Sequence, residues 1–271
     1  MLSIFLLILL GLFMFIFIKG NKNTREVAVK KISVRCPDRK ASAKNIKILH
    51  LSDLHLENLS ISPQKLDQLI STEPIDLIAL TGDFLDRKRS IPKLSAYLKI
   101  LKKANPTYGT YAVFGNHDYV LKEEDFETLK KMLQHYGIKT LQNEHVTIQL
   151  EEECLNIIGI DDYTTNRSYV QKAFHGVEEG MRLVLTHDPS VILEMENIPF
   201  DYLLSGHFHG GQINLPKPYH LFFKGKLPRM NIIKGLHYHN ERPFYISEGL
   251  GQTGVNIRIG SRPEITYHQI L

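Results

Sequence analysis

The chain begins with an uninterrupted apolar run and then changes to short apolar segments separated by polar ones. Leu2 to Ile18, LSIFLLILLGLFMFIFI, contains no charged side chain. A helix of this length spans roughly 25 Å at about 1.5 Å per residue, which is at the short end for a bilayer core of about 30 Å. Because the run is apolar on every face, a helix packed into a soluble core is disfavoured. The run predicts a membrane-spanning helix.

An uncleaved anchor is favoured over a cleaved signal peptide, which stays the alternative. A signal peptide has a positive segment before its apolar run and small residues at its cleavage site. Here the run follows Met1 directly and stays bulky up to Lys19. Cations lie after the run and none before it, so the positive-inside tendency predicts a single-pass protein with a cytoplasmic domain, with export as the alternative. These cations are Lys19, Lys22, Arg25, Lys30 and Lys31.

The next residues, GNKNTRE, predict a short polar linker, so we divide the chain into an anchor with linker, 1–24, and one domain, 25–271. Strands and helices then alternate, which is typical of an α/β domain. Val27 to Val34 predicts an edge or hairpin strand, and Ser62 and Pro63 predict a helix start. The further segments are the strands IKILHLS, IDLIALTG and GTYAVFGN, and the helices QKLDQLIS, IPKLSAYLKILKKA and KEEDFETLKKMLQHYG.

Strands dominate from Glu144 onward, with one helix expected from Pro189 to Glu196. The chain contains no internal repeat, and its pattern favours one domain with two sheets over two domains. The predicted strands of this half are HVTIQL, CLNIIGI, RLVLTH, DYLLSG, FYISEG and VNIRIG.

Composition narrows the chemistry. A hydrophobic content of 43% and a charged content of 23% are ordinary for a globular protein. The net charge of +4 is too small to favour a nucleic-acid partner. Only two cysteines occur, Cys36 and Cys154, which disfavours a disulfide framework or a cysteine-based zinc site. The 13 histidines are the unusual feature, because histidine is the commonest metal-binding side chain.

Polar motifs follow five of the predicted strands. Because loops at the carboxyl ends of strands converge in α/β sheets, these motifs predict one crevice lined by carboxylates, imidazoles and an amide. Such ligands suit Mn, Fe or Zn, and their number suits two ions rather than one. The motifs are Asp53-Leu54-His55, Gly82-Asp83, Gly115-Asn116-His117-Asp118, His187-Asp188 and Gly206-His207-Phe208-His209.

Each motif also has an ordinary structural explanation. Asp83 could cap a turn, Asn116 to Asp118 could form a turn, and Asp188 could cap a helix that starts at Pro189. All five together require five independent coincidences, so a shared site is favoured.

In this order, D-x-H, G-D, G-N-H-D, a single H and G-H-x-H resemble the calcineurin-like metallophosphoesterase superfamily, over roughly Asn45 to Leu271. The segments GHFHGGQINLP and SEGLGQTGVNIRIGSRPEI resemble its bacterial membrane-associated branch, the YkuE/YaeI-like phosphoesterases and relatives that act on UDP-diacylglucosamine. The resemblance implies an α/β fold of two packed mixed β-sheets flanked by helices, an αββα sandwich. It also implies that residues 25–271 form a metallophosphoesterase domain.

The resemblance implies two divalent ions held by seven ligands. The ligands are Asp53, His55 and His209 for the first ion, Asn116, His187 and His207 for the second, and Asp83 as the bridge between them. His117 would not bind metal but would protonate or stabilise the leaving oxygen, and Asp118 would orient its ring.

The expected function is di-metal-dependent hydrolysis of a phosphodiester or pyrophosphate, with a lipid-linked substrate at the membrane. The alternatives are a metal-stabilised binding module with little turnover, attached to membrane or wall, and a nuclease or protein phosphatase on the same scaffold. The segment 217–242 mixes aromatic and basic residues, which suits either a lipid headgroup boundary or a hairpin packed on the domain. The sequence leaves the oligomeric state open.

Overall fold

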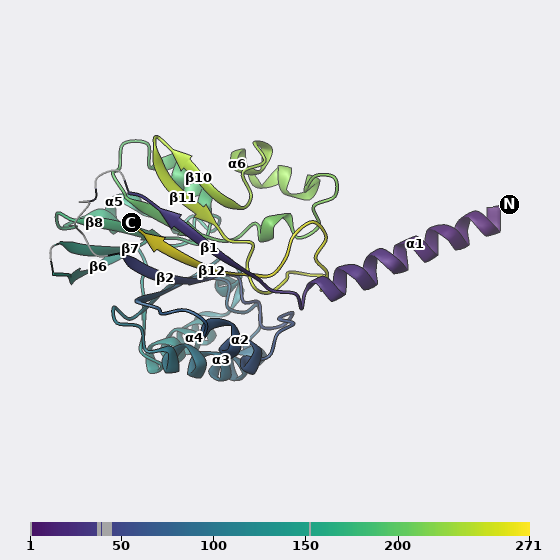
Figure 1. The fold of residues 1–271 in the computed structure, drawn as a ribbon, viewed down its shortest axis with the longest axis horizontal. Coiled ribbons are helices and arrows are strands. Elements are labelled where there is room, and N and C mark those ends of the chain that lie inside the picture. The colour runs from purple at the N-terminus through teal and green to yellow at the C-terminus, as the bar shows by residue number, and fades with distance from the viewer. Residues whose placement is uncertain (1, 37–38, 40–44, 152) are drawn as a thin grey trace.

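The computed structural model describes residues 2–36, 39, 45–151 and 153–271. Within these residues, two six-stranded sheets pack face to face, and helices cover the outer face of each sheet (Figure 1). An apolar helix precedes the sheets and extends away from them. The expected sandwich of two mixed sheets flanked by helices is therefore confirmed.

The first sheet contains the short apolar strands expected from the first half of the chain. Strands β2 to β5 are parallel, whereas β12 is antiparallel to β2 and parallel to the edge strand β1. In spatial order the strands are β1 (Ala28–Val34), β12 (Glu264–Ile270), β2 (Ile46–Leu51), β3 (Leu77–Thr81), β4 (Thr110–Val113) and β5 (Ile138–Thr140).

The second sheet is built from the strands of the second half. Its four central strands are parallel, and an antiparallel strand closes each side. In spatial order the strands are β10 (Gly235–His239), β11 (Arg242–Ile246), β9 (Tyr202–Ser205), β8 (Met181–Leu185), β7 (Cys154–Gly159) and β6 (Glu144–Gln149).

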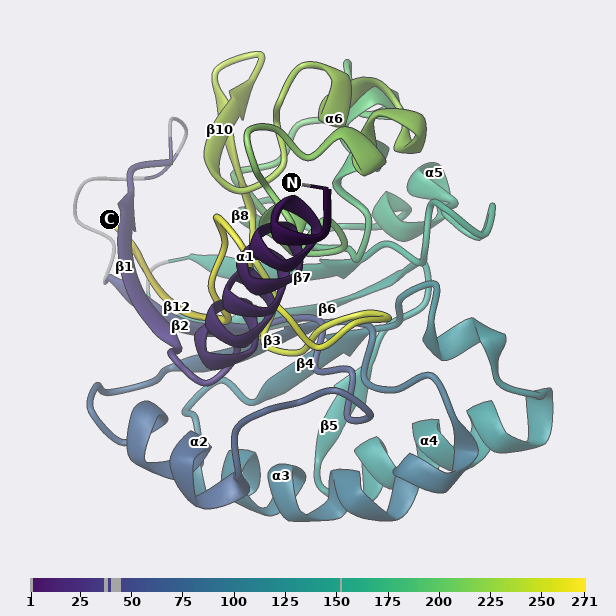
Figure 2. The same ribbon diagram turned by 90° about the vertical axis from the view of Figure 1, so that its right-hand side faces the viewer.

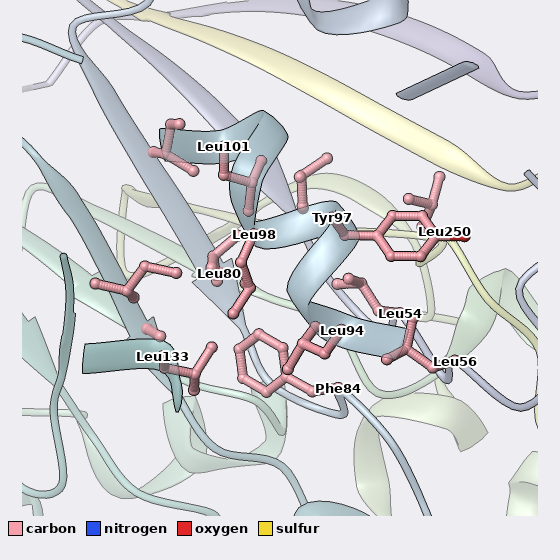
Figure 3. Close-up of a cluster of buried hydrophobic side chains, with 14 of the residues drawn as sticks. Leu54, Leu56, Leu80, Phe84, Leu94, Tyr97, Leu98, Leu101, Leu133 and Leu250 are labelled. Carbon is pink, nitrogen blue, oxygen red and sulfur yellow. The ribbon is translucent and has the colours of Figure 1, made fainter. Parts of the chain in front are cut away.

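The α-helices outside the first sheet are amphipathic and pack their apolar sides on it. Ser62 caps α2 by accepting a hydrogen bond from the Lys65 backbone N–H at 3.2 Å, as its sequence predicts. In Figure 3 Leu94 and Leu98 of α3 face Leu80 of β3 in a continuous apolar cluster. The helices are α2 (Pro63–Ile70), α3 (Ile91–Ala104) and α4 (Glu123–His135) below the first sheet, and α5 (Val170–Phe174) and α6 (Lys226–Arg229) beside the second.

Short 3₁₀ helices join several of these elements. The helix expected from Pro189 to Glu196 is one of them, and the Asp188 side chain caps it by accepting from the Ser190 backbone N–H. These elements are η1 (Lys88–Ser90), η2 (Asp118–Val120), η3 (Pro189–Glu194), η4 (His209–Gly211) and η5 (Tyr219–Lys224).

Helix α1 (Leu2–Asn23) contains the expected apolar run, and its side chains are exposed over most of its length. It is long and apolar enough to cross a membrane. The expected linker GNKNTRE is wrong in its first half, because Gly20 to Asn23 form the last helical turn. This turn lies against the domain, where Gly20 O accepts a hydrogen bond from the Arg258 backbone N–H and a Cβ atom at Gly20 would lie 3.1 Å from Ile257.

The strand expected at VNIRIG is also wrong. The segment 255–260 is irregular, and Ile259 forms only an isolated bridge with Ile213. The reason is Arg258, whose guanidinium is fully buried and binds carbonyl oxygens of the surrounding loops instead of facing a strand neighbour.

The segment 217–242 differs from the simple hairpin considered above. It contains η5 and α6 before the hairpin of β10 and β11. Leu221 and Leu227 are buried in the apolar cluster on the outer side of the second sheet. Some of its apolar side chains therefore pack on the second sheet.

Candidate metal centre

The polar motifs meet at the edge of the two sheets from which α1 emerges. The chain enters β1 directly after α1, β12 is parallel to β1, and β2 is antiparallel to β12. Strand β2 and its parallel neighbours β3 and β4 therefore end beside the base of α1. Strands β8 and β9 of the second sheet deliver the remaining motifs to the same place, because their histidines contact the carboxylates that follow β2 and β3.

Two buried carboxylates stand at the centre of the cluster. Asp83 Oδ2 lies 3.1 Å from His187 Nε2 and 3.4 Å from His55 Nε2. Asp53 Oδ1 lies 3.3 Å from His209 Nε2. His207 Nδ1 lies 3.2 Å from His187 Nε2, which brings the fourth imidazole into the same cluster. Residues from four separate strand ends thus converge, as the sequence predicts.

The ligand atoms are grouped closely enough to hold metal ions. Those of Asp53, His55 and His209 lie within 4.8 Å of one another, and so do those of Asp53, Asp83 and His187. The first group equals the set expected for the first ion. A further group joins His55 and Asp83 with His117, which was expected to stay free of metal.

Orphaned polar atoms indicate that this cluster is built for a further partner. His55 Nε2, His209 Nδ1 and Asn116 Oδ1 are buried and have no hydrogen-bond partner in the described structure. Buried polar atoms are normally paired, and unpaired ones cost free energy. Imidazole nitrogens, carboxylates and one amide oxygen fit divalent Mn, Fe or Zn, so the donor set agrees with a metal centre.

The backbone at the site adopts conformations that residues other than glycine seldom take. Asp53, His55, Asp83, His207 and His209 all have positive φ, between 38° and 74°. Such strain collects at functional sites because the surrounding structure enforces it.

Two glycines allow the motif loops to approach each other. A Cβ atom at Gly115 would lie 2.2 Å from Asp83 Oδ1 and 2.7 Å from His187 Cγ. A Cβ atom at Gly206 would lie 2.3 Å from Asp53 Oδ2. Any side chain at these positions would displace a carboxylate of the cluster.

Burial lowers the pKa of the imidazoles in the cluster, whereas nearby carboxylates raise it. Burial lowers the pKa of His207 to about 3 and holds the pKa of His209 well below its usual value, so both imidazoles are neutral. Burial also opposes a charge on His55, but the nearby carboxylates of Asp83 and Asp86 outweigh burial and raise its pKa to about 10. Neutral imidazole is the form that binds metal, so a cation would replace the proton on His55.

The expected role of Asp118 is corrected by its contacts. Its carboxylate accepts backbone N–H groups of Asp83 at 2.9 Å, Phe84 at 2.9 Å and Gly115 at 3.0 Å. Burial, with the nearby charge of Asp83, raises the pKa of Asp118 to about 7. Asp118 therefore holds the Asp83 and Gly115 loops together, and its oxygens face these loops rather than the His117 ring.

Asp86 is the carboxylate at His117, and sequence reasoning missed it. Its Oδ1 lies 3.2 Å from His117 Nδ1 and 2.9 Å from His55 Nδ1. Burial favours its neutral form, but hydrogen bonds from His117 and His55 outweigh burial and hold its pKa well below the usual value. Asp86 lies three residues after Asp83 in the same loop, and only that proximity signals it in the sequence.

Arg258 is the second missed residue. Its guanidinium donates to the carbonyl oxygens of His209 at 2.7 Å, Glu248 at 2.7 Å, Gly249 at 3.1 Å and Gly251 at 2.6 Å. Its backbone N–H donates to Gly20 O of α1 at 2.9 Å. Arg258 therefore joins the His209 loop to the end of the apolar helix.

Two packed mixed sheets with a buried histidine and aspartate cluster at their strand ends define a metallophosphoesterase. The sequence pattern of the calcineurin-like phosphoesterases matches residues 46–211, more than half of the chain. The protein therefore belongs to the calcineurin-like phosphoesterase family, a family of metal-dependent phosphoesterases.

Three relatives illustrate this membership. Metallophosphoesterase YkoQ of Bacillus subtilis (strain 168) is 62% identical over 97% of this chain and 99% of its own length. Phosphodiesterase YaeI of Escherichia coli (strain K12) is 30% identical over 86% of this chain and 84% of its own. A transmembrane protein with metallophosphoesterase domain from Danio rerio is 29% identical over 88% of this chain and 56% of its own.

Proposed function

We propose that this protein is a membrane-anchored enzyme that hydrolyses a phosphodiester or pyrophosphate bond in a lipid-linked substrate. The observation that carries the proposal is the position of the cluster, which lies at the edge of the sheets where α1 begins its departure from the domain. The Gly20 contact of Arg258 keeps the His209 loop close to the base of that helix. A substrate at the membrane surface is therefore within reach.

The choice of a diester is supported by relatedness. YaeI, whose name is phosphodiesterase, covers most of this chain. A lipid-linked substrate is also consistent with the resemblance to the membrane-associated branch and with the anchor itself, because anchoring helps only if the substrate is at the membrane too.

The ligand roles that we propose are those implied by the family resemblance, and the grouping of Asp53 with His55 and His209, and of Asp83 with His187, supports them. Asp53, His55 and His209 would hold one ion, Asp83 would contribute to both sites, and a second set would complete the other site. Bound divalent cations supply positive charge that offsets the negative charge of the phosphoester and stabilises its displacement. The second set consists of Asn116, His187 and His207.

His117 is the proton donor to the leaving oxygen in this proposal. Its side chain is 30% exposed, whereas the neighbouring His55 and Asp83 are buried, so it faces the space where substrate would enter. Asp86 accepts at His117 Nδ1, which leaves Nε2 for the substrate. Asp118 acts indirectly, by holding the loops of Asp83 and Gly115.

We further propose that α1 is an uncleaved anchor and that the domain faces the cytoplasm. The last turn of α1 is hydrogen-bonded to the domain, through Asn23 Nδ2 to Arg258 O at 2.8 Å and Asn21 Nδ2 to Asn256 O at 2.9 Å. Lysines and arginines follow the apolar run, which favours a cytoplasmic side. Protease added to intact cells should then leave the domain whole, and digestion would indicate export.

A hydrolysis screen tests the function. Purified full-length protein, loaded separately with Mn, Fe or Zn, is offered phosphomonoesters, phosphodiesters and pyrophosphate-linked lipids in vesicles. We expect turnover of the diester or pyrophosphate class and higher rates on the vesicle-borne substrate. Metal binding without turnover of any class would favour the alternative, a metal-stabilised binding module.

A further inference from the structure

A cavity of about 500 Å³ lies between the domain and the C-terminal half of α1. Phe15, Ile16 and Lys19 line it from the helix, and Leu215, Lys234 and Arg262 line it from the domain. Figure 2 looks along α1 and shows the yellow loop before β12 passing beside the base of the helix, where the cavity lies. The space is outside the metal cluster described above.

The cavity combines an apolar wall with an excess of positive charge. Its lining contains three cations, Lys19, Lys234 and Arg262, and one carboxylate, Glu248. Glu248 is already compensated twice, by Lys234 at 3.1 Å and by Lys30 at 3.0 Å. Charge around the cavity is therefore not balanced by its one acid.

Lys19 is the cation of the cavity that has no carboxylate partner among the described residues. Its ammonium lies 6.0 Å from the centre of the Phe15 ring, and within the described residues no carboxylate lies within 4.0 Å of it. Arg262 is only loosely neutralised, by Glu26 at 3.4 Å, and its side chain stays 40% exposed. Both cations are available to an anionic group in the cavity.

The height of the cavity on the helix matches the boundary of a membrane. Lys19 directly follows Ile18, the last residue of the uncharged run. Apolar side chains of the domain stand exposed near the same level, with 65% of Leu215, 52% of Val255 and 39% of Ile213 accessible. Cations and apolar groups mixed in this way suit the layer where lipid phosphates meet acyl chains.

We propose that this cavity binds the headgroup of one anionic phospholipid from the leaflet next to the domain. Lys19 and Arg262 contact the lipid phosphate, and the acyl chains lie along Phe15 and Ile16. The proposal rests on the membrane anchoring proposed above, but it concerns a resident lipid and not the substrate. Such a lipid would fix the domain against the membrane, because it touches both the helix and the loop around Arg262.

Native mass spectrometry of the full-length protein tests the site. The protein is extracted in mild detergent and titrated with phosphatidylglycerol or, as the neutral comparison, phosphatidylcholine. We expect one tightly held phosphatidylglycerol per chain and no comparable retention of phosphatidylcholine. Removing two cations near the headgroup should weaken retention by about 10- to 30-fold, so this loss is expected for the Lys19→Gln/Arg262→Gln variant.

A matched variant separates the site from general surface charge. Lys22→Gln/Lys31→Gln removes the same charge from exposed positions that do not line the cavity, and it should retain the lipid. Leu215→Glu places a negative charge at the rim and should also lose the lipid. Thermal unfolding midpoints close to that of the parent protein show that these variants are folded.

Three results would overturn the proposal. Equal lipid loss in the two double variants would indicate unspecific attraction, and displacement by inorganic phosphate as effective as by phosphatidylglycerol would indicate a free-anion site. An intact mass that lacks α1 would show that the mature protein has no such cavity and would also remove the proposed anchor. The hydrolysis screen is read independently, so failure of the phosphoesterase proposal stays distinguishable.

Discussion

At the residue scale, His117 has two possible roles that one variant separates. If it is the proton donor, His117→Ala should keep both metals and lose turnover by about 10²- to 10⁴-fold, the usual contribution of a positioned general acid. The loss should be smaller for a substrate with a good leaving group such as nitrophenol, because that group needs no proton. Metal analysis and steady-state rates on matched substrates provide the measurement. A collapse of the metal content would make His117 a ligand, as its closeness to His55 and Asp83 allows.

Asp86 should act through the two imidazoles that it orients, those of His55 and His117. Its Oδ1 accepts at both His55 Nδ1 and His117 Nδ1, so Asp86→Ala should weaken metal binding by about 10- to 100-fold and also reduce turnover. Asp86→Asn, which keeps an acceptor oxygen, should lose less of both. Metal titration compares these variants with Asp83→Asn, for which we expect the loss of both ions. Unchanged affinity in Asp86→Ala would show that His55 does not need this support.

The sequence predicted the candidate metal ligands, whose spacing is recognisable. It did not predict the residues that orient these ligands or support their loops. The sequence predicts that Asp53, His55, Asp83, His187 and His209 meet, because each follows an apolar strand. Asp86 and Arg258 gave no such signal. Asp86 lies in a loop whose path depends on the hydrogen bonds of Asp118, and Arg258 lies in a segment whose alternating pattern predicts a strand.

At the scale of elements, hydrogen bonds from Arg258 stabilise the irregular loops between β11 and β12. Arg258→Lys should lower the free energy of unfolding by about 2–5 kcal/mol, because an ammonium cannot serve all four carbonyl oxygens and leaves buried acceptors unpaired. Urea denaturation measures this, with Arg262→Lys as the control at a partly exposed arginine. A change as small as that of the control would mean that water or loop movement satisfies those carbonyls.

The packed sheets also contain a pH-sensitive pair. His50 of β2 and His268 of β12 lie between the sheets, with ring centres 5.5 Å apart, and His268 Nδ1 lies 2.8 Å from Tyr202 Oη of β9. Burial lowers the pKa of His50 to about 3, and burial together with His50 holds the pKa of His268 well below its usual value. Both imidazoles are therefore buried in the neutral form.

The sign of the resulting pH dependence follows directly. Above pH 6.5 neither state binds the proton, whereas below it the unfolded chain does and the folded chain does not, so stability falls as the pH drops towards 3. Between pH 7 and pH 5, the free energy of unfolding should fall by about 2 kcal/mol less in His268→Gln than in the parent protein. Denaturant unfolding at both pH values measures it, with the exposed His135→Gln as control. Equal pH dependence in parent and His268→Gln would mean that His268 is already charged in the folded state.

At the scale of the whole molecule, the last turn of α1 belongs to the domain. Gly20, Asn21 and Asn23 each form a hydrogen bond with the loop that contains Asn256 and Arg258. A fragment that begins at Arg25 should therefore be less stable than one that begins at Lys19, by about 2–4 kcal/mol for three lost hydrogen bonds. Both fragments lack the apolar run, and urea denaturation compares them. Equal stability would make this turn the passive linker that the sequence predicts.

The global architecture was predictable because short apolar strands alternate with helices and then dominate. What the sequence did not reveal depends on long-range pairing. Strand β12 is an example, since its residues Glu264 to Ile270 pair with β1 at the opposite end of the chain. The polar composition of GNKNTRE likewise could not show that its asparagines would find partners more than 200 residues away.

The pairing of β1 with β12 has a consequence for how the protein is made. Strand β1 directly follows the proposed anchor helix, but its partner β12 is synthesised after all the other described strands. At about 5–20 residues per second, translation of the intervening chain takes on the order of ten to fifty seconds. During that time β1 has an unpaired edge, which would recruit other chains if the strand were apolar on both faces. Its alternation of half-buried and exposed residues, with Lys31 among the exposed ones, disfavours such pairing until β12 is available.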